Sequence, residues 1–363
     1  MALKQSADLS DSAAPGLGQA RESTCVALDG TGGDSSDTRP VVEAVRFALA
    51  MYPHLYLIIF GSSQLEKDLA KAGADSKRYE FRLAQQSIPQ DEPPLSVLRH
   101  YSHSAMVQAL RCLKKGEAHA MLSSGGTGPL VCLARHILGV QRLGKSRLAI
   151  KAKLGLPERQ GLVRPGFAAR IPVAPNRFAL MLDLGANAAC NAGDLYDFAC
   201  LGAACAEISL ERDNPRIAIL NVGTELRKGN HLVQQAQEVI SHDRDLHYTG
   251  FIEANRIFRD DADVIVTDGF TGNVALKAAE GVADIYASSA GMKRFFSKLA
   301  RPEWLLPWQY NGSVLLGVNG VVVKSHAHAG KEALAVAMVE AARAAGDDLA
   351  TQMQEQLLKR HQV

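Results

Sequence analysis

Residues Asp263 to Ala279 read DVIVTDGFTGNVALKAA, and this segment carries the clearest structural pattern in the chain. Its first part, Val264 to Thr267, is a β-branched run that predicts a buried strand. From Ala275 onward the apolar residues recur at helical spacing. Between the two parts, Gly269 and Gly272 allow a tight turn whose backbone can approach a ligand closely. The segment therefore predicts a strand, a ligand-binding turn and a helix, in that order.

The turn from Asp268 to Asn273 has the features of an anion-binding site. Asn273 belongs to the residue types that cap helices, and the first free N–H groups of a helix attract an anion. Lys277 follows one turn inside the predicted helix, within reach of that anion. The residues alone leave open a second interpretation, an ordinary capped loop of an α/β protein with an exposed lysine.

Four further apolar runs also end in small, acidic or amide residues. The loops that follow them are Asp29 to Asp34, Ser123 to Gly128, Asp183 to Asn187 and Asn221 to Glu225. Because strands alternate with helices along the chain, we expect an α/β fold with a mostly parallel sheet covered on both faces. Ligands of such sheets bind outside the carboxyl ends of the strands, so the five loops are expected to gather around one site.

The chain is long enough to bury a sizeable core. It has 363 residues, of which 47% are hydrophobic and 21% charged, and we expect one α/β domain over residues 24–350 or two lobes within it. The lobes would comprise residues 24–175 with 310–350, and residues 176–309.

Charge and cysteine usage exclude several classes of function. With 40 basic and 38 acidic residues, the chain does not indicate nucleic-acid binding. Its six cysteines lack a Cys-x-x-Cys pair, which fits reduced thiols of a cytoplasmic protein and no metal site. Residues 1–23 have no apolar segment typical of a signal peptide and predict a disordered tail, and residues 351–363 a C-terminal tail. No apolar run is long enough to span a bilayer.

Two stretches depart from the alternation of strands and helices. The first, Arg142 to Arg164, has one acid, Glu158, among its cations, and predicts either a solvated loop or a docking surface for an acidic partner. The residues expected to dock are Arg142, Lys145, Arg147, Lys151 and Lys153. The second, Gly291 to Trp308, interleaves aromatic and apolar residues with cations, which predicts a peripheral membrane contact or a subunit interface.

Taken together, these segments resemble one family, the bacterial phosphate acyltransferases of phospholipid synthesis, which act on acyl carrier protein. The resemblance runs in order from about Thr24 to Ala342, and the block from Asp263 to Gly281 is its most specific part. The other motifs that carry it are Asp29 to Asp34, Asp183 to Asn187, Asn214 to Glu225 with Lys228 and Gly229, Tyr248 to Glu253, Tyr310 to Gly312, and Lys324 to His326. The chain departs from the family at Gly126, where an Asn is usual, and at Thr224, where a Glu is frequent.

The resemblance implies a three-layer αβα fold similar to that of the phosphotransacetylases and of the isocitrate and isopropylmalate dehydrogenases. It implies a homodimeric enzyme without a cofactor that transfers a fatty acyl group from the acyl carrier protein thioester to inorganic phosphate. The product would be an acyl phosphate for phospholipid synthesis. Phosphate is already a nucleophilic anion, and a thiol with a pKa of about 8.5 needs little protonation to leave. The reaction therefore needs positioning and electrostatics more than a strong base.

The expected roles of the site residues follow from this reaction. The residues expected to be catalytic are Lys277, His326, Lys324 and Asn187. Amide donors of Gly269, Gly272 and Asn273 would hold the phosphate, and Asn187 or one of these donors would stabilise the oxyanion. His326 would either protonate the departing sulfur or orient the phosphate. The further residues expected at the substrate are Asp183, Gly185, Asp268, Ser325, Gly32, Gly33, Gly125 and Thr127.

Three other functions stay open at this point. A phosphotransacetylase would perform the same phosphorolysis on acyl-CoA. A metal- and NAD-dependent dehydrogenase of the related fold would need clustered acids such as Asp183, Glu225 and Asp268, but the chain has no Gly-x-Gly-x-x-Gly motif in the required context. A catalytically idle scaffold would bind the carrier protein at a membrane surface. Beside an anionic substrate, we expect Asp183 and Asp268 to cap turns or orient a lysine rather than act as bases.

Overall fold

The computed structural model describes residues 23–32, 37–289, 311–327 and 329–359. Gly33, nearly all of the predicted N-terminal tail and the predicted membrane contact of Gly291 to Trp308 lie outside these residues. The strands are β1 (Thr24–Asp29), β2 (Leu55–Gly61), β3 (Tyr79–Leu83), β4 (Ala120–Ser123), β5 (Gly166–Ala174), β6 (Arg177–Leu182), β7 (Ile217–Asn221), β8 (Tyr248–Glu253), β9 (Val264–Val266), β10 (Ser313–Leu316) and β11 (Val321–Lys324). The α-helices are α1 (Arg39–Met51), α2 (Ser63–Lys71), α3 (Val97–His100), α4 (Ala105–Lys114), α5 (Thr127–Leu138), α6 (Lys145–Lys153), α7 (Ala192–Ser209), α8 (His231–His242), α9 (Gly269–Ser289), α10 (Lys331–Gly346) and α11 (Leu349–Leu358), and two short 3₁₀ helices span Arg159–Gly161 and Ala254–Arg256.

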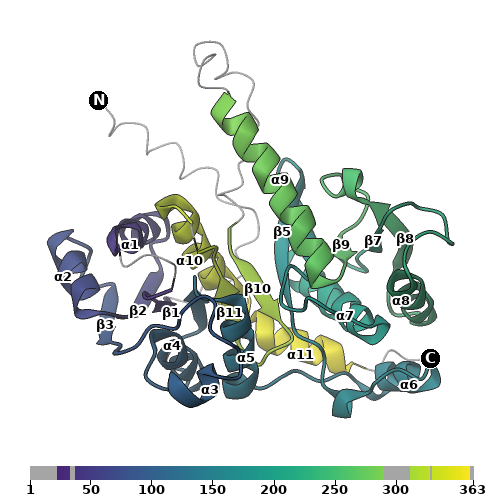
Figure 1. The fold of residues 1–363 in the computed structure, drawn as a ribbon, viewed down its shortest axis with the longest axis horizontal. Coiled ribbons are helices and arrows are strands. Elements are labelled where there is room, and N and C mark those ends of the chain that lie inside the picture. Colours follow the sequence, from purple (N-terminus) through teal and green to yellow (C-terminus); the bar gives the residue numbers. More distant parts are fainter. Residues whose placement is uncertain (1–22, 33–36, 290–310, 328, 360–363) are drawn as a thin grey trace.

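Helices cover both faces of one 11-stranded sheet, whose order is β3-β2-β1-β4-β11-β10-β5-β6-β9-β7-β8 (Figure 1). One face packs mainly against α1, α7, α8, α10 and α11, and the other mainly against α4 and α5. In β1, Val26 and Leu28 belong to the first core and Ala27 to the second. A strand buried on both faces has an unbroken apolar sequence, which is why these runs were recognisable. The predicted three-layer α/β fold is confirmed.

The sheet consists of two parallel sets of strands that run in opposite directions. Strands β3, β2, β1, β4 and β11 are parallel to one another, and so are β6, β9, β7 and β8. Between the two sets, β10 is antiparallel to both β11 and β5, and β5 is antiparallel to β6. Because these three successive pairs are antiparallel, the second set of strands runs antiparallel to the first.

The carboxyl ends of both sets nevertheless meet at one level of the sheet. The strand register places in one cross-strand row the residues Leu28, Leu122, Val323, Val314, Ala168, Leu182 and Val266. Strands β1, β4 and β11 end one residue beyond this row, at Asp29, Ser123 and Lys324. Strands β6 and β9 end on the row itself. The loops that the sequence indicated thus gather along the row, but they approach it from opposite sides.

The basic stretch from Arg142 to Arg164 is not a simple solvated loop, one of the two alternatives predicted for it, because it contains α6 and two of its cations are buried. Arg147 is 6% exposed and Lys151 is 1% exposed. Lys151 Nζ lies 2.6 Å from Asp197 Oδ1 of α7, and Arg147 Nε lies 3.7 Å from Asp243 Oδ2. Burial raises the pKa of Asp197 to about 6, although Lys151 acts in the opposite sense. The prediction that Arg147 and Lys151 belong to a docking surface is therefore wrong.

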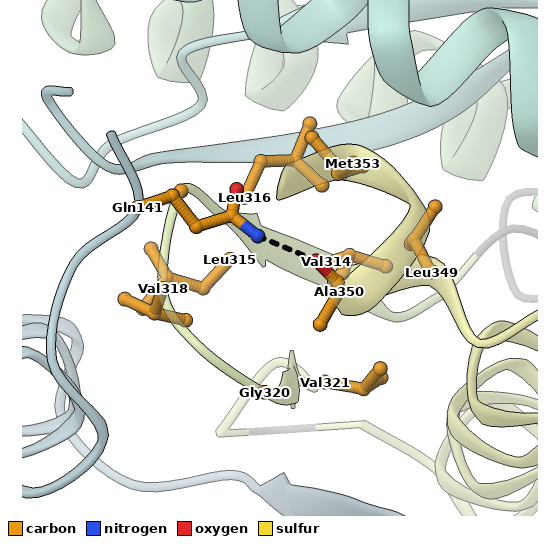
Figure 2. A pocket seen from close by; sticks show the side chains of 11 residues that line it. Gln141, Val314, Leu315, Leu316, Val318, Gly320, Val321, Leu349, Ala350 and Met353 are labelled. Carbon is orange, nitrogen blue, oxygen red and sulfur yellow. Dashed lines mark hydrogen bonds between the residues drawn. The ribbon is translucent and has the colours of Figure 1, made fainter. Parts of the chain in front are cut away.

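The predicted C-terminal tail is also wrong for residues 351–358, which belong to α11. This helix packs against α7, and its Leu349 and Met353 are buried. Figure 2 shows both side chains beside β10, where Gln141 Nε2 donates to the Ala350 carbonyl oxygen at 2.7 Å. The cavity between them measures about 10 Å³, which holds at most one water molecule. This cavity is therefore no ligand site, and α11 completes the cover over the first core.

The two predicted lobes correspond to the two ends of the sheet. Residues 24–175 with 310–350 supply the strands from β3 to β5 in the sheet order, and residues 176–309 supply β6, β9, β7 and β8. One continuous sheet joins them, and the division into lobes stays a prediction. Among the described helices, none combines the length and the apolar character that crossing a bilayer requires.

Candidate functional site

Helix α9 begins earlier than the sequence indicated. It starts at Gly269, so that Asn273 lies in its second turn and not in a loop before it. The residue that caps the helix is Asp268, whose carboxylate accepts hydrogen bonds from the N–H of Thr271 at 2.9 Å and from its hydroxyl at 2.7 Å. The prediction that Asn273 caps the helix is therefore wrong, because Asp268 supplies the acceptor three residues before Thr271.

Two glycines let the start of α9 press against the loop after β6. A Cβ atom on Gly269 would lie 2.6 Å from a carboxylate oxygen of Asp183, and a Cβ atom on Gly272 would overlap the Asp183 carbonyl oxygen. The N–H of Gly269 donates to the carbonyl oxygen of Asn187 at 3.0 Å, and that of Gly272 to the carbonyl oxygen of Asp268 at 2.9 Å. Both N–H groups are used within the fold, which contradicts the prediction that they hold phosphate.

Asp183 is a buried carboxylate surrounded by N–H donors. It accepts from the backbone N–H groups of Phe167, Ala186 and Asn187 at 2.8 to 3.0 Å and from the Asn187 side-chain amide at 2.8 Å. Burial raises the pKa of Asp183, and these hydrogen bonds act in the opposite sense. Asn187 donates its second amide hydrogen to Pro165 O at 2.8 Å. Asp183 thus caps a turn as expected, but it is too buried to touch substrate, and the prediction that Asn187 donates to an oxyanion is wrong.

The loops after β1 and β4 form a second group. Asp29, 4% exposed, accepts from Ser123 Oγ at 2.7 Å and from the hydroxyl of Thr31 at 2.9 Å, and burial raises the pKa of Asp29. The N–H of Gly125 donates to Ser123 Oγ at 2.9 Å. A Cβ atom on Gly32 would lie 2.7 Å from that Gly125 nitrogen. The structure therefore brings Gly32 and Gly125 together, as the sequence predicted.

Three more expected residues lie in the segments that follow β11, β4 and β6. Ser325 is 1% exposed, its N–H donates to the Ser123 carbonyl oxygen at 3.0 Å, and its hydroxyl accepts from Asn311 Nδ2 at 2.7 Å. Thr127 is the first residue of α5. Gly185, with a φ angle of 113°, turns the loop after β6. The hydroxyl of Ser325 is therefore buried, and the prediction that Ser325 faces phosphate is wrong.

Lys277, Glu280 and His326 form a cluster where α9 meets the loop after β11. Lys277 Nζ lies 2.9 Å from Glu280 Oε2 and 3.3 Å from His326 Nδ1. His326 Nε2 lies 3.0 Å from Glu280 Oε1. Burial alone would raise the pKa of Glu280, but the hydrogen bonds from His326 and Lys277 outweigh it and lower that pKa. The side chains of Lys277 and His326 are 50% and 41% exposed, so a ligand can reach both.

The predicted site is thus divided. Lys277 and His326 come together, whereas Gly269 precedes Lys277 by eight residues, which is about 12 Å along a helix. Lys324 lies beside the cluster in sequence, and its Nζ donates to the Ser325 carbonyl oxygen at 3.1 Å. Glu280 was missed by sequence reasoning, although its i, i+3 spacing from Lys277 on a predicted helix was an available signal.

The described residues include a second cavity but no cluster suited to a metal ion. Within them, no group of three or more His, Cys, Asp or Glu side chains could hold a metal ion. A cavity of about 480 Å³ lies beside β7 and β8 and is lined by Ala218, Thr224, Thr249, Phe251, Ile252, Glu253, Arg256 and Asp261. It includes Thr224, one of the departures from the family pattern.

The sheet order, the covering helices and the strand-end loops define an α/β protein of the phosphotransacetylase fold. The structure is similar to that of EutD phosphotransacetylase from Staphylococcus aureus, with a TM-score of 0.59 over 93% of this chain and 97% of that chain, at 14% identity. It is also similar to a phosphotransacetylase from Streptococcus pyogenes, with a TM-score of 0.56 over 89% of this chain and 94% of that chain, at 18% identity.

Within this fold, sequence similarity defines the family. Residues 24–352 match the family model described as Fatty acid synthesis protein. The phosphate acyltransferase of Aeromonas salmonicida is 39% identical over 344 residues, which cover 92% of this chain and 96% of that protein. The phosphate acyltransferase of Halorhodospira halophila is 37% identical over 335 residues, covering 88% and 92%. The chain belongs to this family, and the resemblance predicted from its motifs is confirmed.

Proposed function

We propose that this chain transfers a fatty acyl group from an acyl carrier protein thioester to inorganic phosphate, which yields an acyl phosphate and a free thiol. The observation that carries the proposal is the Lys277–Glu280–His326 cluster, a half-exposed ammonium group held between a carboxylate and an imidazole. The cluster joins α9, which follows β9 of one set, to the loop after β11 of the other set, and ligands of such sheets bind outside the carboxyl ends of the strands. The names of the relatives, phosphate acyltransferase, support the same reaction.

The reaction requires mainly positive charge and correct positioning from the cluster. A phosphate oxygen attacks the thioester carbonyl carbon, a carbon–oxygen bond forms, and the carbon–sulfur bond breaks to release a thiolate. Lys277 would offset the negative charge that phosphate brings and that develops on the carbonyl oxygen. Because a thiol pKa is about 8.5, the thiolate needs no strong acid to leave.

The direct test is the release of free thiol from a long-chain acyl carrier protein thioester, with and without added phosphate. We expect release that depends on phosphate. Equal or faster phosphorolysis of acyl-CoA would favour the phosphotransacetylase alternative. Absence of thiol release from both thioesters would favour the idle scaffold, and release without phosphate would contradict acyl transfer to phosphate.

We further propose that the exposed cations of the basic stretch, Arg142, Lys145 and Lys153, dock the acidic carrier protein. Reversing two charges with Lys145→Glu and Lys153→Glu should raise KM for the carrier thioester about tenfold at low salt, with a smaller rise at high salt and nearly unchanged kcat. The matched control is Lys67→Glu with Lys71→Glu on α2, at the opposite end of the molecule (Figure 1). A salt-independent change of KM, or equal changes in both double variants, would disprove docking at this surface.

We also propose that α9 forms the interface of a homodimer. Phe270, Val274 and Val282 are 66%, 53% and 69% exposed and lie along one side of the helix, which projects from the body of the molecule (Figure 1). An exposed apolar stripe of this kind marks an interaction surface. Light scattering should give a mass of two 39.0 kDa chains, and Val274→Asp with Val282→Asp should give one. A monomeric wild type, or a dimeric double variant, would refute this interface.

The membrane contact of Gly291 to Trp308 follows α9 in the sequence and remains a separate proposal. It rests on the mixture of aromatic residues and cations in that stretch,. Sedimentation with anionic lipid vesicles checks it, since recovery of the whole protein in the supernatant would contradict the contact.

A further inference from the structure

The hydrogen bonds of the Lys277–Glu280–His326 cluster restrict the protonation of its histidine. A lysine ammonium can only donate hydrogen bonds, and a carboxylate can only accept them. His326 Nδ1 lies 3.3 Å from Lys277 Nζ, so this nitrogen has to accept. His326 Nε2 lies 3.0 Å from Glu280 Oε1, so that nitrogen has to donate. Both contacts are hydrogen bonds at the same time only when the imidazole is neutral and carries its proton on Nε2,.

This tautomer leaves His326 without a proton for the departing sulfur. Its Nδ1 carries none, and the proton on Nε2 is shared with the Glu280 carboxylate. A doubly protonated imidazole would place an N–H group against the ammonium group of Lys277, where two donors face each other without an acceptor. The geometry therefore favours the second of the two roles considered for His326, an orienting role.

The same bonds set the direction of Lys277. An ammonium group has three N–H donors, and the distances of 2.9 and 3.3 Å assign one to Glu280 and one to His326. The Lys277 side chain is 50% exposed, so its third donor is accessible to a ligand. Two fixed bonds restrict rotation of the ammonium group and hold that third donor in one direction.

We propose that His326 and Glu280 are positioning residues that aim the third N–H of Lys277 at an oxygen of the phosphate, and that His326 transfers no proton. This inference rests on the proposed acyl transfer to phosphate. It goes further because it assigns a role to Glu280 and separates positioning from acid catalysis at His326. The ligand class is an oxyanion such as inorganic phosphate, since a donor-only group recognises an acceptor-only one.

The kinetic test compares His326→Ala with His326→Asn. The carboxamide oxygen of asparagine can stand near the place of Nδ1 and accept from Lys277, but asparagine has no titratable proton. We expect His326→Ala to lower kcat for phosphate-dependent thiol release about 100-fold and His326→Asn to stay within about tenfold of wild type, with an unchanged pH profile. Equal losses in the two folded variants, or no loss in His326→Ala, would overturn the proposal.

A spectroscopic test does not depend on activity. In ¹⁵N-labelled protein, two-bond imidazole correlations distinguish the Nε2–H tautomer from the Nδ1–H tautomer and from the imidazolium ion. The chain has 11 histidines, and the signals lost in His326→Asn identify those of His326. We expect the Nε2–H pattern at neutral pH, and loss of that preference in Glu280→Ala. An imidazolium pattern would overturn the tautomer assignment, whereas failure of wild-type thiol release would overturn only the proposed function.

Discussion

Lys277→Ala should lower kcat/KM for phosphate-dependent thiol release by about 100- to 1,000-fold, the effect of removing one electrostatic donor from an active site. The reason is that Lys277 is the cation of the cluster and its ammonium group is half exposed, while Glu280 and His326 hold it in place. The loss should include a higher KM for phosphate. Initial rates at varied phosphate, with the carrier thioester saturating, measure it.

Two matched variants test whether the effect depends on the position and on the geometry of the ammonium group. Lys115→Ala removes an ammonium group that lies 3.7 Å from Glu117, between α4 and the amino end of β4 and thus away from the carboxyl strand ends. It should leave the rates unchanged. Lys277→Arg keeps the charge but not the compact three-donor geometry, and it should recover only part of the rate. If kcat/KM of Lys277→Ala stays within a few-fold of the wild-type value, the cluster is not where phosphate is activated.

Asp197→Ala should lower the free energy of unfolding by about 3–5 kcal/mol, because it leaves the ammonium group of Lys151 buried without its partner. Lys151 and Asp197 are 1% and 0% exposed and 2.6 Å apart. The second carboxylate oxygen of Asp197 also accepts the N–H of Arg164 at 2.9 Å. Urea denaturation of the variant and the wild type measures the change, provided that both free energies of unfolding fall with urea concentration at the same slope.

The double variant Lys151→Met with Asp197→Asn separates burial of charge from loss of packing. Asparagine retains an oxygen for the N–H of Arg164, and methionine replaces the apolar stem of the lysine, so most of the lost stability should return. Glu43→Ala serves as the control, since it removes an exposed partner of Lys331, and it should not move the midpoint. Equal midpoints for Asp197→Ala and wild type would contradict a stabilising role of the buried pair.

A connection from α6 to the site follows from the same contacts. Asp197 holds the backbone of Arg164, and the Nε of Arg164 donates to the side-chain oxygen of Asn187. Asn187 in turn donates to Asp183 in the loop beside α9. Through the pair of Lys151 and Asp197, the basic stretch thus supports the loop after β6, while its exposed cations face solvent. A single segment carries both buried pairs and a free surface because its helix has two sides.

Several features were predictable because they depend on neighbours in sequence. The strand from Val264 and the helix after it follow from a β-branched run and helical spacing. The start of that helix was misplaced, because Gly269 and Gly272 have low helix propensity and only their contact with Asp183 explains why they lie in α9. Local preference thus identified the element, and packing against another loop set its first residue.

The alternation of strands and helices, the polar loops after the strands and the family resemblance could all be predicted, since they are local patterns of the sequence. The opposite directions of the two sets of strands, the burial of Lys151 and the contact of Glu280 with Lys277 and His326 became evident in the folded chain alone. The residues of these contacts are far apart in the chain: 46 positions separate Lys151 from Asp197 and Glu280 from His326. Periodicity reports the face of an element that is apolar, but not the distant residue that this face will meet.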